Sequence, residues 1–150
     1  MKRLSVLLAS SALAVSAHAV NWSKVSESQT GSVFSLDLES IEVSDISIID
    51  EKDIENITVS IRRTYPETES ETKAGEENQI HHSDQQLLIS CKDASYYRRA
   101  YVNYGAGNKV LKSWQSEQPI LTTKDFHVTT PKTVGFTLLE KACKIYEQAK

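Results

Sequence analysis

Apolar and polar residues alternate in several segments of the chain, which is the period of a strand with one buried face. Ile57, Val59 and Ile61 show this alternation clearly, and Pro66 ends their segment because proline has no amide hydrogen to donate to a sheet. The principal predicted strands cover residues 21–26, 32–38, 57–65, 85–91, 95–104 and 109–115.

A single amphipathic helix is predicted at the C-terminal end of the chain, from Thr130 to Lys150. Thr130 suits the N-cap, and Pro131 suits the first helical position. Apolar side chains then recur every three or four residues and form one stripe, made of Val134, Leu138, Leu139, Ala142, Cys143 and Tyr146. The pattern predicts an α+β fold, with an antiparallel sheet of about six strands packed against one C-terminal helix.

Two short turns are expected to join the last three strands. Asp93-Ala94 is predicted to be a two-residue turn, and Gly105–Asn108 a four-residue turn. A slip of one residue in this register would exchange the two faces of the sheet. The predicted helix-facing set is Leu87, Ile89, Cys91, Tyr96, Ala100, Val102 and Leu111, and the predicted outer face carries Tyr97, Arg99, Tyr101, Val110, Lys112 and Trp114.

The N-terminal residues 1–19 have the pattern of a cleaved export signal. Lys2 and Arg3 precede an apolar run, and Ala17-His18-Ala19 is a small-x-small cleavage site. The apolar run is too short to span a membrane, and no cysteine stands at the cleavage point for a lipid anchor. We expect one exported domain at 20–150, periplasmic or released. Residues 67–84, rich in Glu, Thr, Ser and Asn, are expected to be a mobile acidic loop.

Cys91 and Cys143 are the two cysteines of the chain. In an oxidising compartment two lone cysteines most simply form a disulfide, and two buried free thiols are the alternative. Export and the even count favour the disulfide.

Charge is unevenly distributed along the chain. Residues 20–84 carry 5 basic and 15 acidic side chains, a net of −10, whereas residues 85–150 carry 10 basic and 5 acidic ones, a net of +5. Such a distribution can create a dipolar surface that steers partners, unless the two halves interleave and their charges pair locally. The net charge of −5 for residues 20–150 argues against a nucleic-acid partner.

Several short motifs occur in a recognisable order after the signal. They are Trp22-x-x-Val25, a strand ending in Leu88-Ile89-Ser90-Cys91, a Tyr-rich strand followed by a glycine turn and Trp114, and Pro131-x-x-x-Gly135 leading into residues 138–144. This order resembles the surface-adhesin protein E family of small exported bacterial proteins. The resemblance implies an antiparallel sheet packed on a C-terminal helix, a Cys91–Cys143 disulfide, and adhesion to host extracellular-matrix proteins.

The predicted outer face is the strongest candidate for a binding site. Tyr97, Arg99, Tyr101 and Trp114 are residue types enriched in interaction hot spots. In this register the guanidinium of Arg99 could lie over the ring of Trp114. Ordinary cross-strand stabilisation of a half-exposed sheet is the alternative explanation of these residues.

Metal binding and catalysis receive less support from the sequence. His81-His82-Ser83-Asp84 contains ligand types, but adjacent histidines of a strand point to opposite faces, and no third ligand has a recognisable spacing. His127 is the remaining histidine weighed for small-ligand capture. No nucleophile motif or phosphate loop occurs, so no enzyme activity, cofactor or metal is expected.

The sequence therefore predicts a non-enzymatic binding protein of the bacterial envelope whose partner is another protein. One hypothesis is an adhesin for host extracellular-matrix proteins. The other is a soluble periplasmic protein for interaction or envelope maintenance, with no adhesive role.

Overall fold

The computed structural model describes residues 20–46, 48–50, 55–66, 79–118 and 120–150. The predicted signal peptide and residues 67–78 of the predicted acidic loop lie outside the described residues. The strands are β1 (Trp22–Glu27), β2 (Val33–Asp37), β3 (Glu42–Val43), β4 (Ile57–Thr64), β5 (His82–Ser90), β6 (Ser95–Tyr104), β7 (Val110–Gln115) and β8 (His127–Val128).

These strands form one antiparallel sheet with the order β1-β2-β4-β5-β6-β7 across its width. The short strand β3 pairs with β4, and β8 pairs with β6. The predicted strands are all present, and the two short strands raise the total to eight in the described part of the chain. β5 begins at His82, three residues before the predicted start, so the last residues assigned to the acidic loop belong to the strand.

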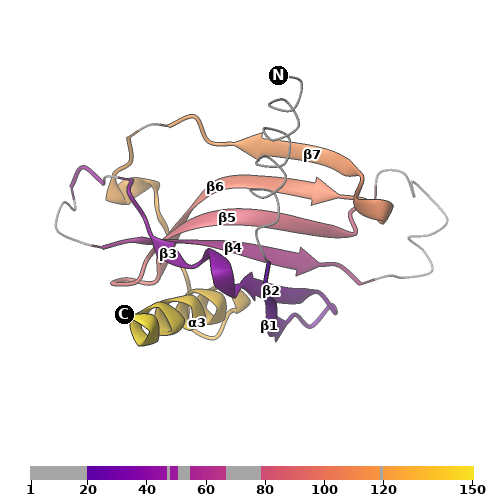
Figure 1. The fold of residues 1–150 in the computed structure, drawn as a ribbon, viewed down its shortest axis with the longest axis horizontal. Coiled ribbons are helices and arrows are strands. Elements are labelled where there is room, and N and C mark those ends of the chain that lie inside the picture. The colour runs from indigo at the N-terminus through magenta and orange to yellow at the C-terminus, as the bar shows by residue number, and fades with distance from the viewer. Residues whose placement is uncertain (1–19, 47, 51–54, 67–78, 119) are drawn as a thin grey trace, which may run out of the picture.

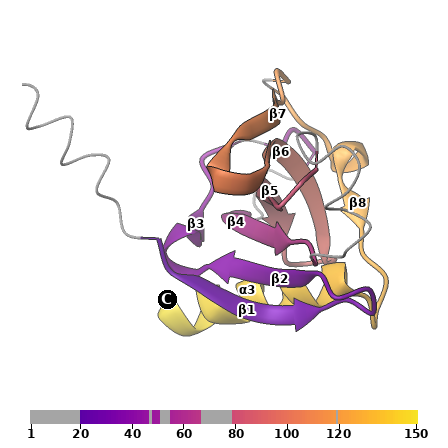
Figure 2. The same cartoon turned by 90° about the vertical axis from the view of Figure 1, so that its right-hand side faces the viewer.

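The C-terminal helix α3 (Val134–Ala149) lies beside β1 and β2, while β7 lies at the other edge of the sheet (Figures 1 and 2). The predicted stripe of α3 is confirmed, because its side chains join a core formed with β2, β4 and β5. Burial of such side chains stabilises each by about 1.5–3 kcal/mol. The buried members of this core are Leu36, Ile57, Val59, Ile61, Leu87, Ile89, Leu138, Leu139 and Ala142.

The helix begins later than the sequence predicts. Thr133, not Thr130, is the N-cap, and its hydroxyl accepts a hydrogen bond from the backbone N–H of Phe136 at 3.2 Å. Lys132 has a φ of +70°, a left-handed conformation that an α-helix cannot contain. The prediction was wrong because the hydroxyl and N–H of Thr133 turn back to the carbonyl oxygen of Thr130, at 2.6 and 3.3 Å.

A disulfide between Cys91 and Cys143 joins the end of β5 to α3, which confirms the predicted crosslink. The two residues are 52 positions apart in the sequence. Both cysteines pack at the edge of the main core. The helix is therefore fixed to the sheet by apolar packing and by a covalent bond.

A second, smaller core lies apart from the main core. Ile48, Leu88 and Leu121 are its buried members, and Tyr97 and Phe126 pack against it. Ile48 and Leu121 are also joined by an isolated β-bridge. This core includes Ile46 and Ile48 of the segment after β3, and Leu121 and Phe126 of the segment before β8, so both segments are tied to the sheet.

Candidate binding surface

The β5–β6 hairpin differs from the predicted register in two places. Ser90 pairs with Ser95, so Cys91–Ala94 form a four-residue turn rather than the predicted two-residue turn. A two-residue turn of the favoured type needs a positive φ at both central residues, and of Asp93 and Ala94 only Ala94 has one. The difference moves the pairing by two positions and keeps Tyr96 on the helix-facing side, opposite Ile89.

A β-bulge at Arg99 then reverses the faces of the second half of β6. Leu87 pairs with Arg98, but Gln86 pairs with Ala100, which leaves Arg99 as the extra residue. The predicted helix-facing positions of Ala100 and Val102 are therefore wrong, because both residues lie on the other face. The bulge also turns Tyr101 to the side of the sheet that Leu87 and Ile89 occupy.

Three of the four predicted binding residues are aromatic, and the bulge divides them between two faces. Tyr101 pairs with Trp114 of β7, and their rings stack with centroids 5.9 Å apart. Tyr97 pairs with Leu88 and packs its ring 6.3 Å from that of Phe126 in the second core. Its hydroxyl hydrogen-bonds to the hydroxyl of Ser116. Tyr97 is thus partly a packing residue, whereas the Tyr101–Trp114 pair lies on the helix-facing side of the sheet, beyond the part that α3 covers, so its predicted place on the outer face is wrong.

The cation near the aromatic pair is Arg98, a residue that the sequence analysis did not select. The guanidinium carbon of Arg98 lies 5.7 Å from the ring centroid of Tyr101, and the Nζ atom of Lys112 lies 6.0 Å from it. Arg99, the predicted cation, instead provides a backbone carbonyl that accepts a hydrogen bond from the N–H of Ser116 at 2.7 Å. No sequence signal marks the bulge that exchanges these two arginines.

A groove of about 420 Å³ opens where β7 and β8 leave part of β6 uncovered. Both strands pair along the same edge of β6, β7 with residues 100–104 and β8 with residues 95–96. The edge at 97–99 therefore lies between them. The groove, called the aromatic groove below, is lined by Tyr96, Tyr97, Arg98, Tyr101, Trp114 and His127.

The strands around the aromatic groove carry positive charge without local compensation. The segment 95–116 contains four basic residues and no acidic one. Among the residues that the structure describes, neither Arg98 nor Lys112 forms an ion pair. Within the described part of the chain, the basic half of the sequence thus keeps positive charge without an ion pair here, and an acidic partner would be attracted to it.

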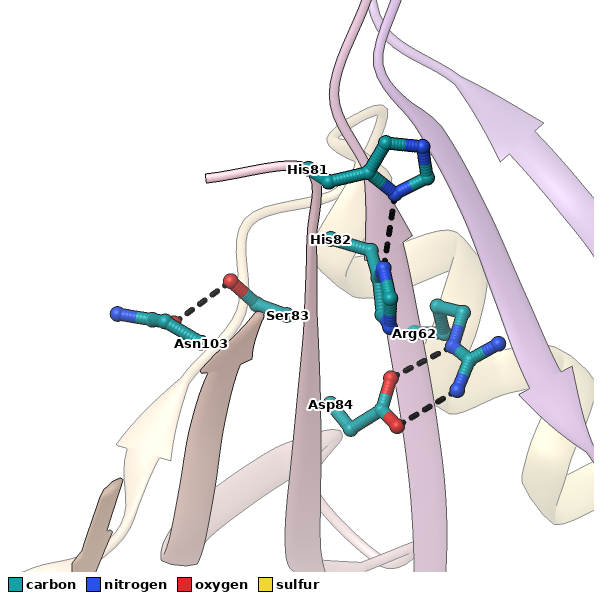
Figure 3. A network of polar contacts seen from close by, with 6 residues as sticks. All are labelled: Arg62, His81, His82, Ser83, Asp84 and Asn103. Carbon is teal, nitrogen blue, oxygen red and sulfur yellow. Dashed lines mark hydrogen bonds and ion pairs between the residues drawn. The ribbon is translucent and has the colours of Figure 1, made fainter. Parts of the chain in front are cut away.

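A polar cluster, separate from the aromatic groove, lies at the start of β5 (Figure 3). The Nδ1 atoms of His81 and His82 are 2.9 Å apart, so the prediction that these side chains point to opposite faces is wrong. The reason is that β5 begins at His82, which leaves His81 outside the strand alternation. Among the described residues, no group of three or more His, Cys, Asp or Glu side chains could hold a metal ion.

The surroundings of His82 disfavour the protonated form of its ring. His82 is 5% exposed, and its ring stacks on that of Tyr104 at 4.7 Å. Burial, followed by the nearby positive charge of Arg62, lowers the pKa of His82 from its ordinary value of 6.5. Arg62 itself donates two hydrogen bonds to the carboxylate of Asp84, at 2.7 and 2.8 Å, and this pairing raises the pKa of Arg62.

Comparison with known proteins finds similarity in fold. Two solved structures of Haemophilus influenzae protein E resemble this chain. One, in crystal form II, is 15% identical with a TM-score of 0.46 and covers 76% of this chain and 82% of its own. The other is 14% identical with a TM-score of 0.49, and the match covers 87% of this chain and 89% of the protein E chain. No protein-family model matches the chain, and a search of curated proteins finds no similar one.

Proposed function

We propose that this chain is an exported, non-enzymatic binding protein of the bacterial envelope that holds another protein in its aromatic groove. The observation that carries the proposal is the stacked Tyr101–Trp114 pair, flanked by two cations on a part of the sheet that α3 does not cover. Trp114 is 43% exposed, although buried aromatic side chains are the rule in a packed sheet.

The residue types and the charge indicate what kind of partner the groove suits. Aromatic side chains with a neighbouring arginine provide large contact area at low cost in side-chain entropy. Because the surrounding strands are basic, the matching surface of the partner is expected to be acidic. Within the described residues, no helix is long and apolar enough to cross a membrane.

Adhesion to host extracellular-matrix proteins is the specific activity that we propose, in line with the resemblance of the sequence motifs. The test is binding of the purified protein to a panel of purified matrix proteins, measured by surface plasmon resonance. The double variant Tyr101→Ala/Trp114→Ala is expected to weaken binding at least a hundredfold, since hot-spot residues each contribute about 2 kcal/mol or more.

Arg98 and Arg99 provide a matched pair of control variants. Arg98→Ala removes the cation beside Tyr101 and is expected to weaken binding about tenfold or more, mainly through faster dissociation. Arg99→Ala removes an equal charge but keeps the backbone carbonyl that holds Ser116, so binding should change little. Equal losses for both variants would mean that general charge, rather than the groove, attracts the partner.

The location of the protein decides whether adhesion is physically possible. Protease treatment of intact producing cells should digest the protein if it is displayed at the surface, and the culture medium should contain it if it is released. Full protection together with release by osmotic shock would place it in the periplasm and would rule out the adhesin proposal.

A further inference from the structure

The histidine pair at the start of β5 carries an inference that is independent of the aromatic groove. We propose that the Nδ1 atoms of His81 and His82 form an open binding site for a divalent transition metal, with Cu(II) or Ni(II) preferred over Zn(II). Two imidazole nitrogens of adjacent residues converge here from a strand start and the residue before it (Figure 3). Imidazole is a good ligand for all three metals.

The ligand type decides which metals the histidine pair suits. The 2.9 Å between the Nδ1 atoms of His81 and His82 is the length of a hydrogen bond, and it brings both nitrogens within reach of one ion. Among divalent metals, Cu(II) is the one that nitrogen ligands bind most tightly. Square-planar or tetragonal coordination is typical of Cu(II) and Ni(II), and tetrahedral coordination is typical of Zn(II).

The backbone on both sides fixes the two residues in place. The N–H of His81 donates to the carbonyl oxygen of Tyr104 at 2.7 Å, and the carbonyl oxygen of His81 accepts from the N–H of Tyr65 at 3.0 Å. The ring of His82 is held by stacking on Tyr104, with 20° between the ring planes. Because these contacts restrict the site before a metal binds, little conformational entropy is lost on binding.

Access is also suited to a metal. His81 is exposed, so an ion can reach its ring from solvent. The metal then replaces the hydrogen bond between the two rings.

The neighbouring charges exclude hard cations from this site. Asp84 accepts hydrogen bonds on both carboxylate oxygens from Arg62, so it does not serve as a free oxygen ligand for Ca²⁺ or Mg²⁺. Since the described residues supply two ligands, water or a ligand from another molecule completes the coordination, and the bound metal remains exchangeable.

Calorimetric titration of the purified protein with Cu(II), Ni(II) or Zn(II), each alone and in a non-coordinating buffer, tests the proposal. We expect one Cu(II) per chain, bound more tightly than Zn(II), with an electron paramagnetic resonance spectrum showing two imidazole nitrogens. His81→Ala should weaken Cu(II) binding at least tenfold. Because His81 is exposed, this variant should keep the circular dichroism spectrum of the unchanged protein.

Two further variants make the outcome decisive. His82→Phe keeps an aromatic ring against Tyr104 but removes the ligand, so it should weaken Cu(II) binding as much as His81→Ala does. His127→Ala removes the exposed histidine of β8, which packs near Tyr96 of β6, and it should leave the affinity for Cu(II) unchanged. Unchanged Cu(II) affinity in His81→Ala, tighter binding of Zn(II) than of Cu(II), or an equal loss in His127→Ala would each overturn the proposal.

Discussion

The two edges of the sheet differ in how they are covered and fixed. At one edge, α3 packs over β1 and β2, and the Cys91–Cys143 disulfide ties the helix to the end of β5. At the other edge, β7 has no helix over it and exposes Val110 and Trp114, which are 56% and 43% exposed. In the described part of the chain, β7 pairs only with β6. The edge with β1 and β2, called the covered edge below, is therefore stabilised by helix packing and a crosslink. The edge with β7, called the bare edge below, instead exposes an aromatic side chain.

The charges differ between the same two regions. The segment 32–45, which contains β2 and β3, carries four acidic residues and no basic one, while the segment 95–116 carries four basic residues and no acidic one. The ion pairs of the described residues leave the second segment uncompensated. The described acidic and basic segments thus lie toward opposite edges of the sheet, and the ion pair between Lys150 and Glu55 joins the two halves of the sequence.

Removal of the disulfide should give the largest change in stability. The chain-entropy model assigns about 4 kcal/mol to a crosslink that closes a loop of this length, so Cys91→Ala/Cys143→Ala should lower the free energy of unfolding by about that amount. Urea unfolding followed by circular dichroism measures the change. A loss below about 1 kcal/mol would show that packing alone fixes α3 to the sheet.

Truncation of a buried residue of the helix should have the next largest effect. Leu139 is 1% exposed and belongs to the main core, so Leu139→Ala should lower the free energy of unfolding by about 2–5 kcal/mol through lost burial and a cavity. Val110→Ala at the bare edge is the control, and surface changes of this kind usually alter stability by less than ~0.5 kcal/mol. Urea unfolding measures both losses. Similar losses for the two variants would show that the two edges contribute equally to stability.

Acidification should weaken the part of the sheet where the histidines lie. The pKa of His82 is lowered in the folded state, so the unfolded state binds more protons and stability falls as the pH drops below about 6.5. Burial of the ring, which stacks on Tyr104, is the largest cause of this lower pKa, and the charges of Arg62 and His81 add to it. The charge of Asp84 acts in the opposite direction. In thermal melts between pH 7.5 and 5.0, His82→Phe should reduce the fall. An equal fall in both proteins would assign it to other groups.

The sequence predicts the covered edge better than the bare edge, and the reason is physical. Apolar periodicity identifies Leu138 and Ala142 of α3 and Ile57 and Val59 of β4 because their burial is set by local alternation or helical spacing. The crosslink follows from an even number of cysteines. Each of these features depends on a regular pattern, and the pattern continues unbroken through the element.

The bare edge depends on irregular features that leave no mark in a single sequence. The bulge at Arg99 brings Arg98, rather than Arg99, to Tyr101, and it reverses the faces of Ala100 and Val102. The start of β5 at His82, rather than Gln85, likewise brings two histidine rings together. Such shifts by one residue or a few are decided by pairing with neighbouring strands, which local propensity does not contain.

The aromatic pair itself should show the smallest effect on stability and so provides the sharpest test of the comparison. Trp114→Ala is expected to lower the free energy of unfolding by about 1 kcal/mol or less, because the side chain is 43% exposed. A double-mutant cycle with Tyr101→Ala should give a coupling of about 0.5–1 kcal/mol, the usual value for a stacked cross-strand pair. Urea unfolding of the four proteins supplies the cycle.

The ranking of these variants by loss of partner binding should differ from their ranking by loss of stability. Trp114→Ala is expected to reduce partner binding while the protein stays folded, and Leu139→Ala is expected to leave the affinity of the folded fraction unchanged. A coupling above about 2 kcal/mol, together with unchanged binding, would instead make Tyr101 and Trp114 a stabilising pair of the sheet. That result would support cross-strand stabilisation as the role of these aromatic residues, because a recognition surface must lose affinity when its exposed anchor is removed.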